Sequence, residues 1–96
     1  MNHPIEASVA GSTVSGGMTM DNAATLLAQG AEALAKGITT FDLSRVTEVD
    51  SSGLAVMFGW QRTALMQGKT IAIVNPPQNL RSLAEVYDVT ALLPLS

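Results

Sequence analysis

Hydrophobic and polar residues alternate in two short stretches near the N-terminus. Ile5, Ala7 and Val9 are separated by polar neighbours, which predicts a half-buried β-strand over residues 5–9. The stretch STVSGGM (12–18) predicts a second, weaker strand, and Gly16 and Gly17 within it favour a bulge or a turn. The pattern therefore predicts two strands before the first helix.

The spacing changes to that of a helix after residue 18. Small and apolar residues recur three or four positions apart, at Ala24, Leu27, Ala28, Ala31, Leu34 and Ala35. A helix is predicted to begin at Thr19 or Asp21, either of which can cap its first turn, and to end at Gly37.

Strands and helices continue to alternate in the rest of the chain. The stretch ITTFDL (38–43) predicts an interior strand, KTIAIVN (69–75) predicts another, and a helix is predicted between them from about Ser52 to Gln67. A last helix is predicted in QNLRSLAEVYDV (78–89), with one apolar face made of Leu80, Leu83, Ala84 and Tyr87. The order β-β-α-β-α-β-α predicts a single α/β sandwich domain, in which helices lie mainly on one face of a mixed sheet of four to five strands.

Composition agrees with one folded domain. The chain has 96 residues, of which 47% are hydrophobic and 14% are charged, so it is too apolar to be disordered. No apolar run approaches the roughly 20 residues that a membrane helix needs. The first residues, MNHPIEASVAGS, lack the pattern of a signal peptide, so we expect a cytoplasmic protein with no direct membrane insertion.

Charge and residue inventory narrow the function. The net charge is −3 and the five Lys and Arg residues are scattered, so a nucleic-acid partner is not expected. His3 is the only histidine and there is no cysteine, which argues against a His-dependent triad and against a His or Cys metal site. Asp42 and Asp50 have no third acidic residue beside them and no phosphate-binding loop. We therefore expect no catalytic residues, no metal and no cofactor.

The stretch VDSSGLAV (49–56) joins a predicted strand to the predicted helix at Ser52. Ser51 is expected at or next to the N-cap, where its hydroxyl would accept a backbone hydrogen bond. Asp50 adds negative charge at the positive end of the helix, and Gly53 permits another group to approach closely. This pattern fits a simple helix start, but it also fits a hydroxyl presented to a phosphate or to a partner.

The same helix has apolar residues on more than one side. At about 100° per residue, one face holds Leu54, Met57, Phe58 and Leu65, and we expect this face to lie on the sheet. Val56 and Trp60 fall on the far side, with Thr63 beside them, which predicts a partner-binding surface because Trp is enriched in interfaces. The alternative is that Trp60 lies flat on surface side chains or under a neighbouring helix.

FDLSRVTEVDSSGLAVM, preceded by VSGGMT and followed by GKTIAIVNPPQNLRSLAEVYDV, resembles a STAS domain, the fold of anti-sigma-factor antagonists. The resemblance covers residues 5–93. In regulatory members of this family, a partner kinase phosphorylates the hydroxyl residue directly after the aspartate of this signature. That position is Ser51 in this sequence.

Within the STAS family, the chain resembles most the small cytoplasmic subunits of Mla phospholipid-transport ABC complexes. The ending LAEVYDVTALLPL is similar to theirs, and Thr19 stands where antagonists commonly have an acidic residue. The resemblance implies a non-catalytic accessory subunit, peripheral at the inner membrane, that binds the transporter ATPase and supports outer-membrane lipid asymmetry. The alternative is a phosphorylation-regulated antagonist that binds an anti-sigma-factor serine kinase.

The predicted site combines both lines of reasoning. The residues expected to contact the partner are Ser51, Ser52, Val56, Trp60 and Thr63. The residues expected to support the site are Asp50, Gly53 and Thr19.

Overall fold

The computed structural model describes residues 6–95. Four strands, three α-helices and two short 3-10 helices follow one another in the order β1 (Ser8–Ala10), β2 (Thr13–Met18), η1 (Met20–Asn22), α1 (Ala23–Ala35), β3 (Thr40–Val49), α2 (Ser51–Met66), β4 (Ala72–Val74), α3 (Gln78–Val86) and η2 (Thr90–Leu92). The predicted alternation of strands and helices is confirmed.

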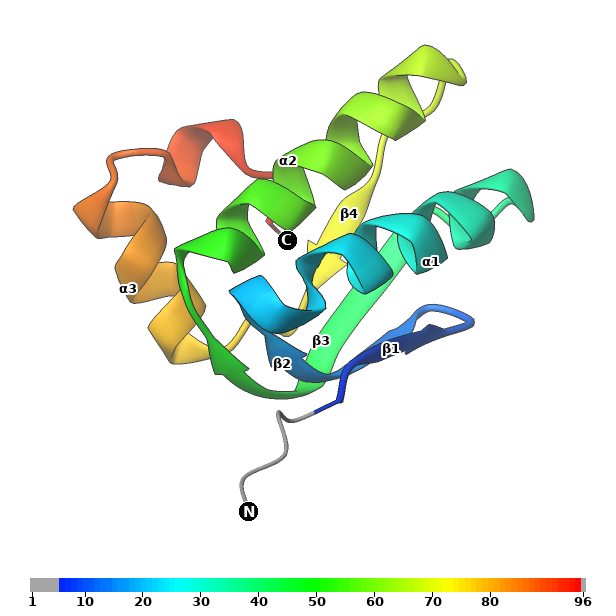
Figure 1. Cartoon of the computed structure of the whole chain (residues 1–96). Coiled ribbons are helices and arrows are strands. Elements are labelled where there is room, and N and C mark those ends of the chain that lie inside the picture. The colour runs from blue at the N-terminus through cyan, green and yellow to red at the C-terminus, as the bar shows by residue number, and fades with distance from the viewer. Residues whose placement is uncertain (1–5, 96) are drawn as a thin grey trace.

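The strands form one mixed sheet in the order β1-β2-β3-β4 (Figure 1). β1 and β2 are antiparallel, as expected for a hairpin, whereas β2, β3 and β4 are parallel and are joined by helical crossovers. The β2–β3 register shifts between Gly16 and Gly17, so the predicted bulge is present. Gly16 has φ +86°, and a Cβ there would overlap the backbone carbonyl of Glu6. The α/β class and the four-stranded mixed sheet are as predicted.

Two helices cover one face of the sheet. α1 and α2 lie side by side across it, whereas α3 packs at one end against α2 and β3 (Figure 1). In β3, Phe41 and Leu43 point toward the helices and are fully buried, while Thr40 and Ser44 are exposed on the other face. This alternation along β3 is the reason that a helix layer forms on only one side.

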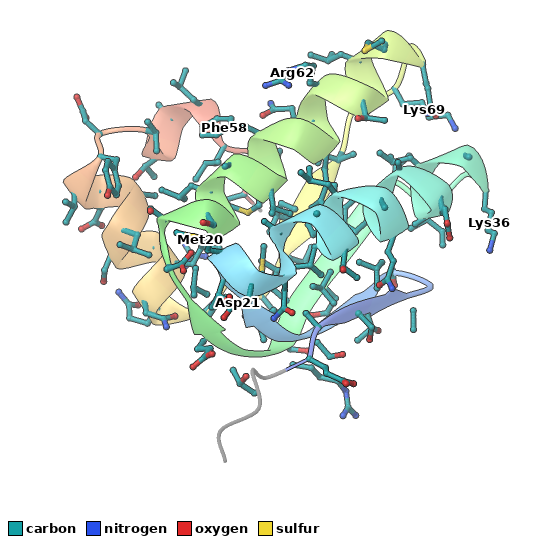
Figure 2. All side chains as sticks on the ribbon, viewed as in Figure 1. Met20, Asp21, Lys36, Phe58, Arg62 and Lys69 are labelled. Atoms are coloured by element: carbon teal, nitrogen blue, oxygen red, sulfur yellow. The ribbon has the colours of Figure 1, made fainter. Side chains whose placement is uncertain are left out.

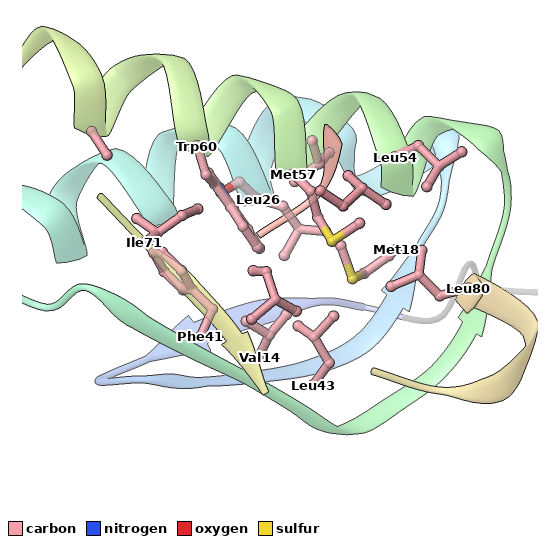
Figure 3. Packing of buried hydrophobic residues seen from close by; sticks show 14 of the residues in the cluster. Val14, Met18, Leu26, Phe41, Leu43, Leu54, Met57, Trp60, Ile71 and Leu80 are labelled. Carbon is pink, nitrogen blue, oxygen red and sulfur yellow. The ribbon is translucent and has the colours of Figure 1, made fainter. Parts of the chain in front are cut away.

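Trp60 is the largest fully buried side chain of the core and lies over Phe41 (Figure 3). Its ring stacks on Phe41 with centroids 4.5 Å apart and an interplanar angle of 18°. Its Nε1 donates a hydrogen bond of 2.9 Å to the backbone carbonyl of Leu26 in α1. A Cβ on Gly30 would overlap the indole, so Gly30 is the place where α1 comes close enough to cover it.

The predicted orientation of α2 is wrong. Trp60 and Val56, expected on the far side, are 1% and 0% exposed, whereas Leu65, expected on the sheet, is 62% exposed. Leu54 and Met57 are buried as predicted, and Phe58 is only partly buried. The reason is that α2 has apolar residues on nearly all sides and packs on two surfaces, the sheet and α1. Its buried arc is therefore rotated toward α1.

The predicted face of α1 is also rotated. Its buried residues are Leu26, Gly30, Ala33 and Leu34, whereas Leu27 is 38% exposed and Ala24, Ala28 and Ala35 are exposed. Alanine is tolerated both inside and on the surface, so its spacing says little about which side of a helix is buried. The helix begins later than expected, since residues 20–22 form η1 and the Thr19 side chain caps neither element.

Strand bounds differ most at the sheet edges. β1 begins at Ser8, and Ile5 of the predicted strand lies outside the described residues. The interior strand β3 begins two residues later than predicted but ends at Val49, next to the stretch 49–56 as predicted, because it pairs with β2 as far as Val49. β4 has only three residues. In α3, Leu80 and Ala84 are buried as predicted, but Tyr87 follows the helix and is 55% exposed.

Candidate functional site

Asp50 caps α2 and connects it to a second segment. Its backbone is extended (φ −119°, ψ −172°), and its Oδ1 accepts a hydrogen bond of 2.8 Å from the backbone N–H of Ser52. Its Oδ2 accepts another, of 3.1 Å, from the backbone N–H of Met20 in η1. The N-cap is therefore Asp50 and not Ser51, and one carboxylate positions both segments that border the start of α2.

Ser51 is the first residue of α2 and is exposed. Its hydroxyl makes no hydrogen bond to another residue within 6–95. Ser52, directly after it, is half-buried and gives its N–H to Asp50. Ser51 lies next to the N-cap, as expected, but the hydrogen bond expected from its hydroxyl is wrong because the carboxylate of Asp50 makes the cap, and this leaves the Ser51 hydroxyl open to solvent.

Gly53 and Thr19 belong to the supporting structure. A Cβ on Gly53 would lie 3.0 Å from the backbone carbonyl of Met18 and 2.8 Å from Cγ1 of Val49. This confirms the expected close approach and explains how the end of β2 fits against the first turn of α2. Thr19 is half-buried, and its carbonyl accepts a hydrogen bond of 3.0 Å from the backbone N–H of Asn22.

An apolar groove of about 250 Å³ runs beside Ser51, between α2 and the segment after α3. Its lining residues are Ser51, Leu54, Ala55, Phe58, Tyr87 and Val89. Asp88 has φ +57°, a left-handed conformation that aspartate tolerates, and this turn separates Tyr87 from Val89 on the groove wall. Sequence reasoning missed Tyr87 and Val89 as site residues, because it placed both inside the last predicted helix, whereas α3 ends at Val86.

A second segment, η1, contacts α2 near its start. Met20 is 76% exposed and lies beside the first turn of α2 (Figure 2). Its backbone N–H donates a hydrogen bond to the carboxylate of Asp50, the N-cap of that helix. Met20, Ser51, Ala55, Phe58, Tyr87 and Val89 are called here the Ser51 surface. An apolar surface whose polar side-chain groups are the neutral hydroxyls of Ser51 and Tyr87 is suited to contact with another protein.

The other predicted contact residues do not join this surface. Val56 and Trp60 are buried in the domain's own core, and Trp60 already has a hydrogen-bond partner and a stacking partner. Their expected role as exposed contacts is therefore wrong. Thr63 is half-buried one turn beyond Gly59 and is not among the groove residues.

Residues 6–95 show neither a cluster of metal-ligating side chains nor a helix suited to a bilayer. They contain no group of three or more His, Cys, Asp or Glu side chains arranged to hold a metal ion. No helix formed by these residues has both the length and the apolar character needed to cross a bilayer.

Comparison with known proteins agrees with this architecture. A model of the family described as "Mlab, STAS domain" matches residues 6–94. The intermembrane phospholipid transport system binding protein MlaB of Escherichia coli K12 is 37% identical over 60 residues, which is 62% of each chain. The protein of the same name in Haemophilus influenzae is 32% identical over 62% of this chain and 57% of its own. The match thus spans less than two thirds of these relatives.

Two solved structures share the fold at low sequence identity. The anti-sigma factor antagonist SpoIIAA in its unphosphorylated form is similar with a TM-score of 0.55 and 20% identity, covering 84% of this chain and 81% of its own. A putative anti-sigma factor antagonist from Thermotoga maritima is similar with a TM-score of 0.68 and 18% identity, covering 93% and 82%. With the sheet, the Asp-capped helix and the family match together, the chain belongs to the Mlab-type STAS domain family.

Proposed function

We propose that this chain is an accessory subunit of an Mla-type phospholipid transporter and that it binds the ATPase subunit through the Ser51 surface. The observation that supports this most is the apolar groove beside an exposed, unbonded serine at the start of α2. The relatives named for intermembrane phospholipid transport supply the system. On this proposal the chain supports lipid asymmetry of the outer membrane and is peripheral at the inner membrane through its partner.

The chemistry of the Ser51 surface favours binding over catalysis. A nucleophilic serine needs a nearby general base, and the neighbouring carboxylate, Asp50, is already bonded to two backbone N–H groups. The rest of the surface is apolar or aromatic, which is the composition of an interface core. The chain therefore acts by contact, without a catalytic step of its own.

A phosphorylation-regulated antagonist is the second candidate. It is favoured by the fold shared with anti-sigma factor antagonists and by the accessible hydroxyl of Ser51. In that role the chain binds a serine kinase, and a phosphate on Ser51 releases it. Intact-mass measurement of protein from its native host separates the two roles, because only the antagonist requires a phosphorylated fraction that Ser51→Ala abolishes.

The direct test compares two surface substitutions of the same kind. Ala55 lines the groove and is exposed on α2, whereas Ala28 is exposed on α1 away from the groove. Ala55→Arg is expected to weaken binding to the purified ATPase subunit at least tenfold, because a long charged side chain fills an apolar contact. Ala28→Arg is expected to bind as the parent does. Both should melt near the parent temperature, and equal binding by both variants would refute the proposed surface.

A further inference from the structure

Charge is distributed unevenly along the long direction of the domain. The chain has eight acidic residues and five basic residues. Lys36 and Lys69 lie at the end of the α1–α2 layer away from Ser51, near the acidic residue Glu32, whereas Arg62 lies on α2 one helical turn after Phe58 (Figure 2). The part of the domain that contains the Ser51 surface therefore has most of the negative charge.

Two carboxylates border the Ser51 surface on opposite sides of α2. Asp21 follows Met20 in η1, which contacts α2, and Asp88 lies between the groove residues Tyr87 and Val89. Both side chains are exposed, and neither forms an ion pair with another residue of the described range 6–95. Neither carboxylate is needed for a cap or a buried network, in contrast to Asp50.

This arrangement differs from an ordinary solvated surface in the position of its charges. The apolar groove is at the centre and the two carboxylates adjoin its margins, while two of the cations, Lys36 and Lys69, lie at the opposite end of the α1–α2 layer. One cation, Arg62, lies closer, one helical turn after Phe58. Protein interfaces commonly have an apolar core and a polar rim, and rim charges match charges of the opposite sign on the partner. A partner with acidic residues at the same border would be repelled by Asp21 and Asp88.

We infer that the face of the ATPase subunit that covers the Ser51 surface has an apolar centre flanked by Lys or Arg side chains, and that Asp21 and Asp88 pair with them. This inference rests on the proposed function and adds the chemistry of the partner. Asp21 and Asp88 steer the two proteins together, and the apolar groove holds the complex once formed. Association is therefore faster at low ionic strength, and the same charges orient the domain so that its basic end points away from the partner.

The test uses two variants of equal net charge. Asp21→Asn with Asp88→Asn removes two negative charges from the border, and asparagine keeps the left-handed conformation accessible at position 88. Glu32→Lys changes the net charge by the same amount at the other end of α1. The association rate constant with the purified ATPase subunit is measured by stopped flow or biosensor at low and at high salt. Thermal melts confirm that both variants are folded.

At about 50 mM salt, the double variant is expected to associate about three- to tenfold more slowly than the parent, while Glu32→Lys stays near the parent rate. At about 0.5 M salt, where screening is nearly complete over contact distances, the three rates should converge. If the parent binds but the double variant and Glu32→Lys behave alike, this inference fails and the proposed function stands. If the parent does not bind the ATPase at any salt concentration, both fail.

Discussion

At the scale of single residues, the cap of α2 decides whether the hydroxyl of Ser51 is available to a partner. The sequence pattern located the right eight residues and placed Ser51 at or next to the N-cap, but it expected the capping hydrogen bond from the hydroxyl of Ser51 and not from the carboxylate of Asp50. Aspartate and serine are about equally good caps, so spacing alone does not decide between neighbours. The structure decides it, because Asp50 alone reaches both Ser52 and Met20. The consequence is functional, since a serine that caps a helix is not available to a partner.

Substitution at the two neighbouring positions is therefore expected to have different effects on stability. Asp50→Ala should lower the free energy of unfolding by about 1–2 kcal/mol, because it removes the cap of α2 and the bond to η1. Ser51→Ala should change it by less than about 0.5 kcal/mol, as for other exposed positions. Urea unfolding of both variants measures this, and a larger loss from Ser51→Ala would restore serine as the cap.

Trp60 has a structural role in place of the contact role expected from its helical position. Trp60→Ala should cost about 3–5 kcal/mol, because it removes the stack on Phe41 and leaves a cavity under α1. Leu65→Ala on the exposed side of the same helix is the control and should cost less than about 1 kcal/mol. Thermal and urea melts distinguish the two, and an unchanged stability of the Trp60 variant would place this side chain outside the core.

At the scale of elements, the packing of α1 on α2 decides which face of each helix is buried. Strand and helix order could be read from periodicity, since alternation and three-to-four spacing differ clearly. The buried faces could not, because α1 is rich in alanine and α2 is apolar on most sides. Gly30 identifies the buried face of α1, because the indole of Trp60 packs directly against it. A glycine inside a helix is a cue to close packing that periodicity does not weigh.

Two helical glycines offer a matched test of this packing. Gly30→Ala should destabilise the domain by about 1–3 kcal/mol despite the better helix propensity of alanine, because its methyl group meets the rigid indole. Gly59→Ala should be neutral or mildly stabilising, because its methyl group meets the flexible, partly exposed end of Leu27. The midpoint of urea unfolding gives both values. Equal effects at the two positions would show that α1 and α2 do not pack as described.

The hydrogen bonds that Asp42 of β3 accepts from Ser44 and from Asn75, the residue after β4, predict that the stability of the domain decreases at acid pH. The pKa of Asp42 is lowered, first by the backbone N–H of Ser44 and then by the side chain of Asn75, which donate to its Oδ1 over 2.9 and 3.1 Å. Because the folded pKa lies below the ordinary value of 3.8, this stabilisation is present above that value and is lost as pH falls through the folded pKa. Asp42→Asn should therefore lose less stability than the parent between about pH 5 and pH 3. The free energy of unfolding, measured by urea unfolding at several pH values, checks this prediction. The same dependence on pH in both proteins would contradict it.

At the scale of the whole molecule, the fold and family followed from sequence, whereas the candidate surface did not. The stretch VDSSGLAV (49–56) and the order of strands and helices carried enough information to assign the chain to the STAS family. The Ser51 surface is assembled from η1, α2 and the end of α3, which are far apart in the chain. Residues such as Met20 and Tyr87 have no local signal for joining it. The uneven charge distribution likewise appears only when α1 and α2 lie side by side.

The central claim is that a partner ATPase covers the Ser51 surface, and amide hydrogen exchange of the domain with and without that subunit tests it most directly. Backbone N–H groups in the first turn of a helix lack intrahelical partners, so they report sensitively on being covered. The account predicts slower exchange in the complex over residues 19–22, 50–58 and 86–92. Exchange over residues 62–70 and on the open face of the sheet should stay unchanged. Protection confined to those last regions, with residues 50–58 unaffected, would contradict the account.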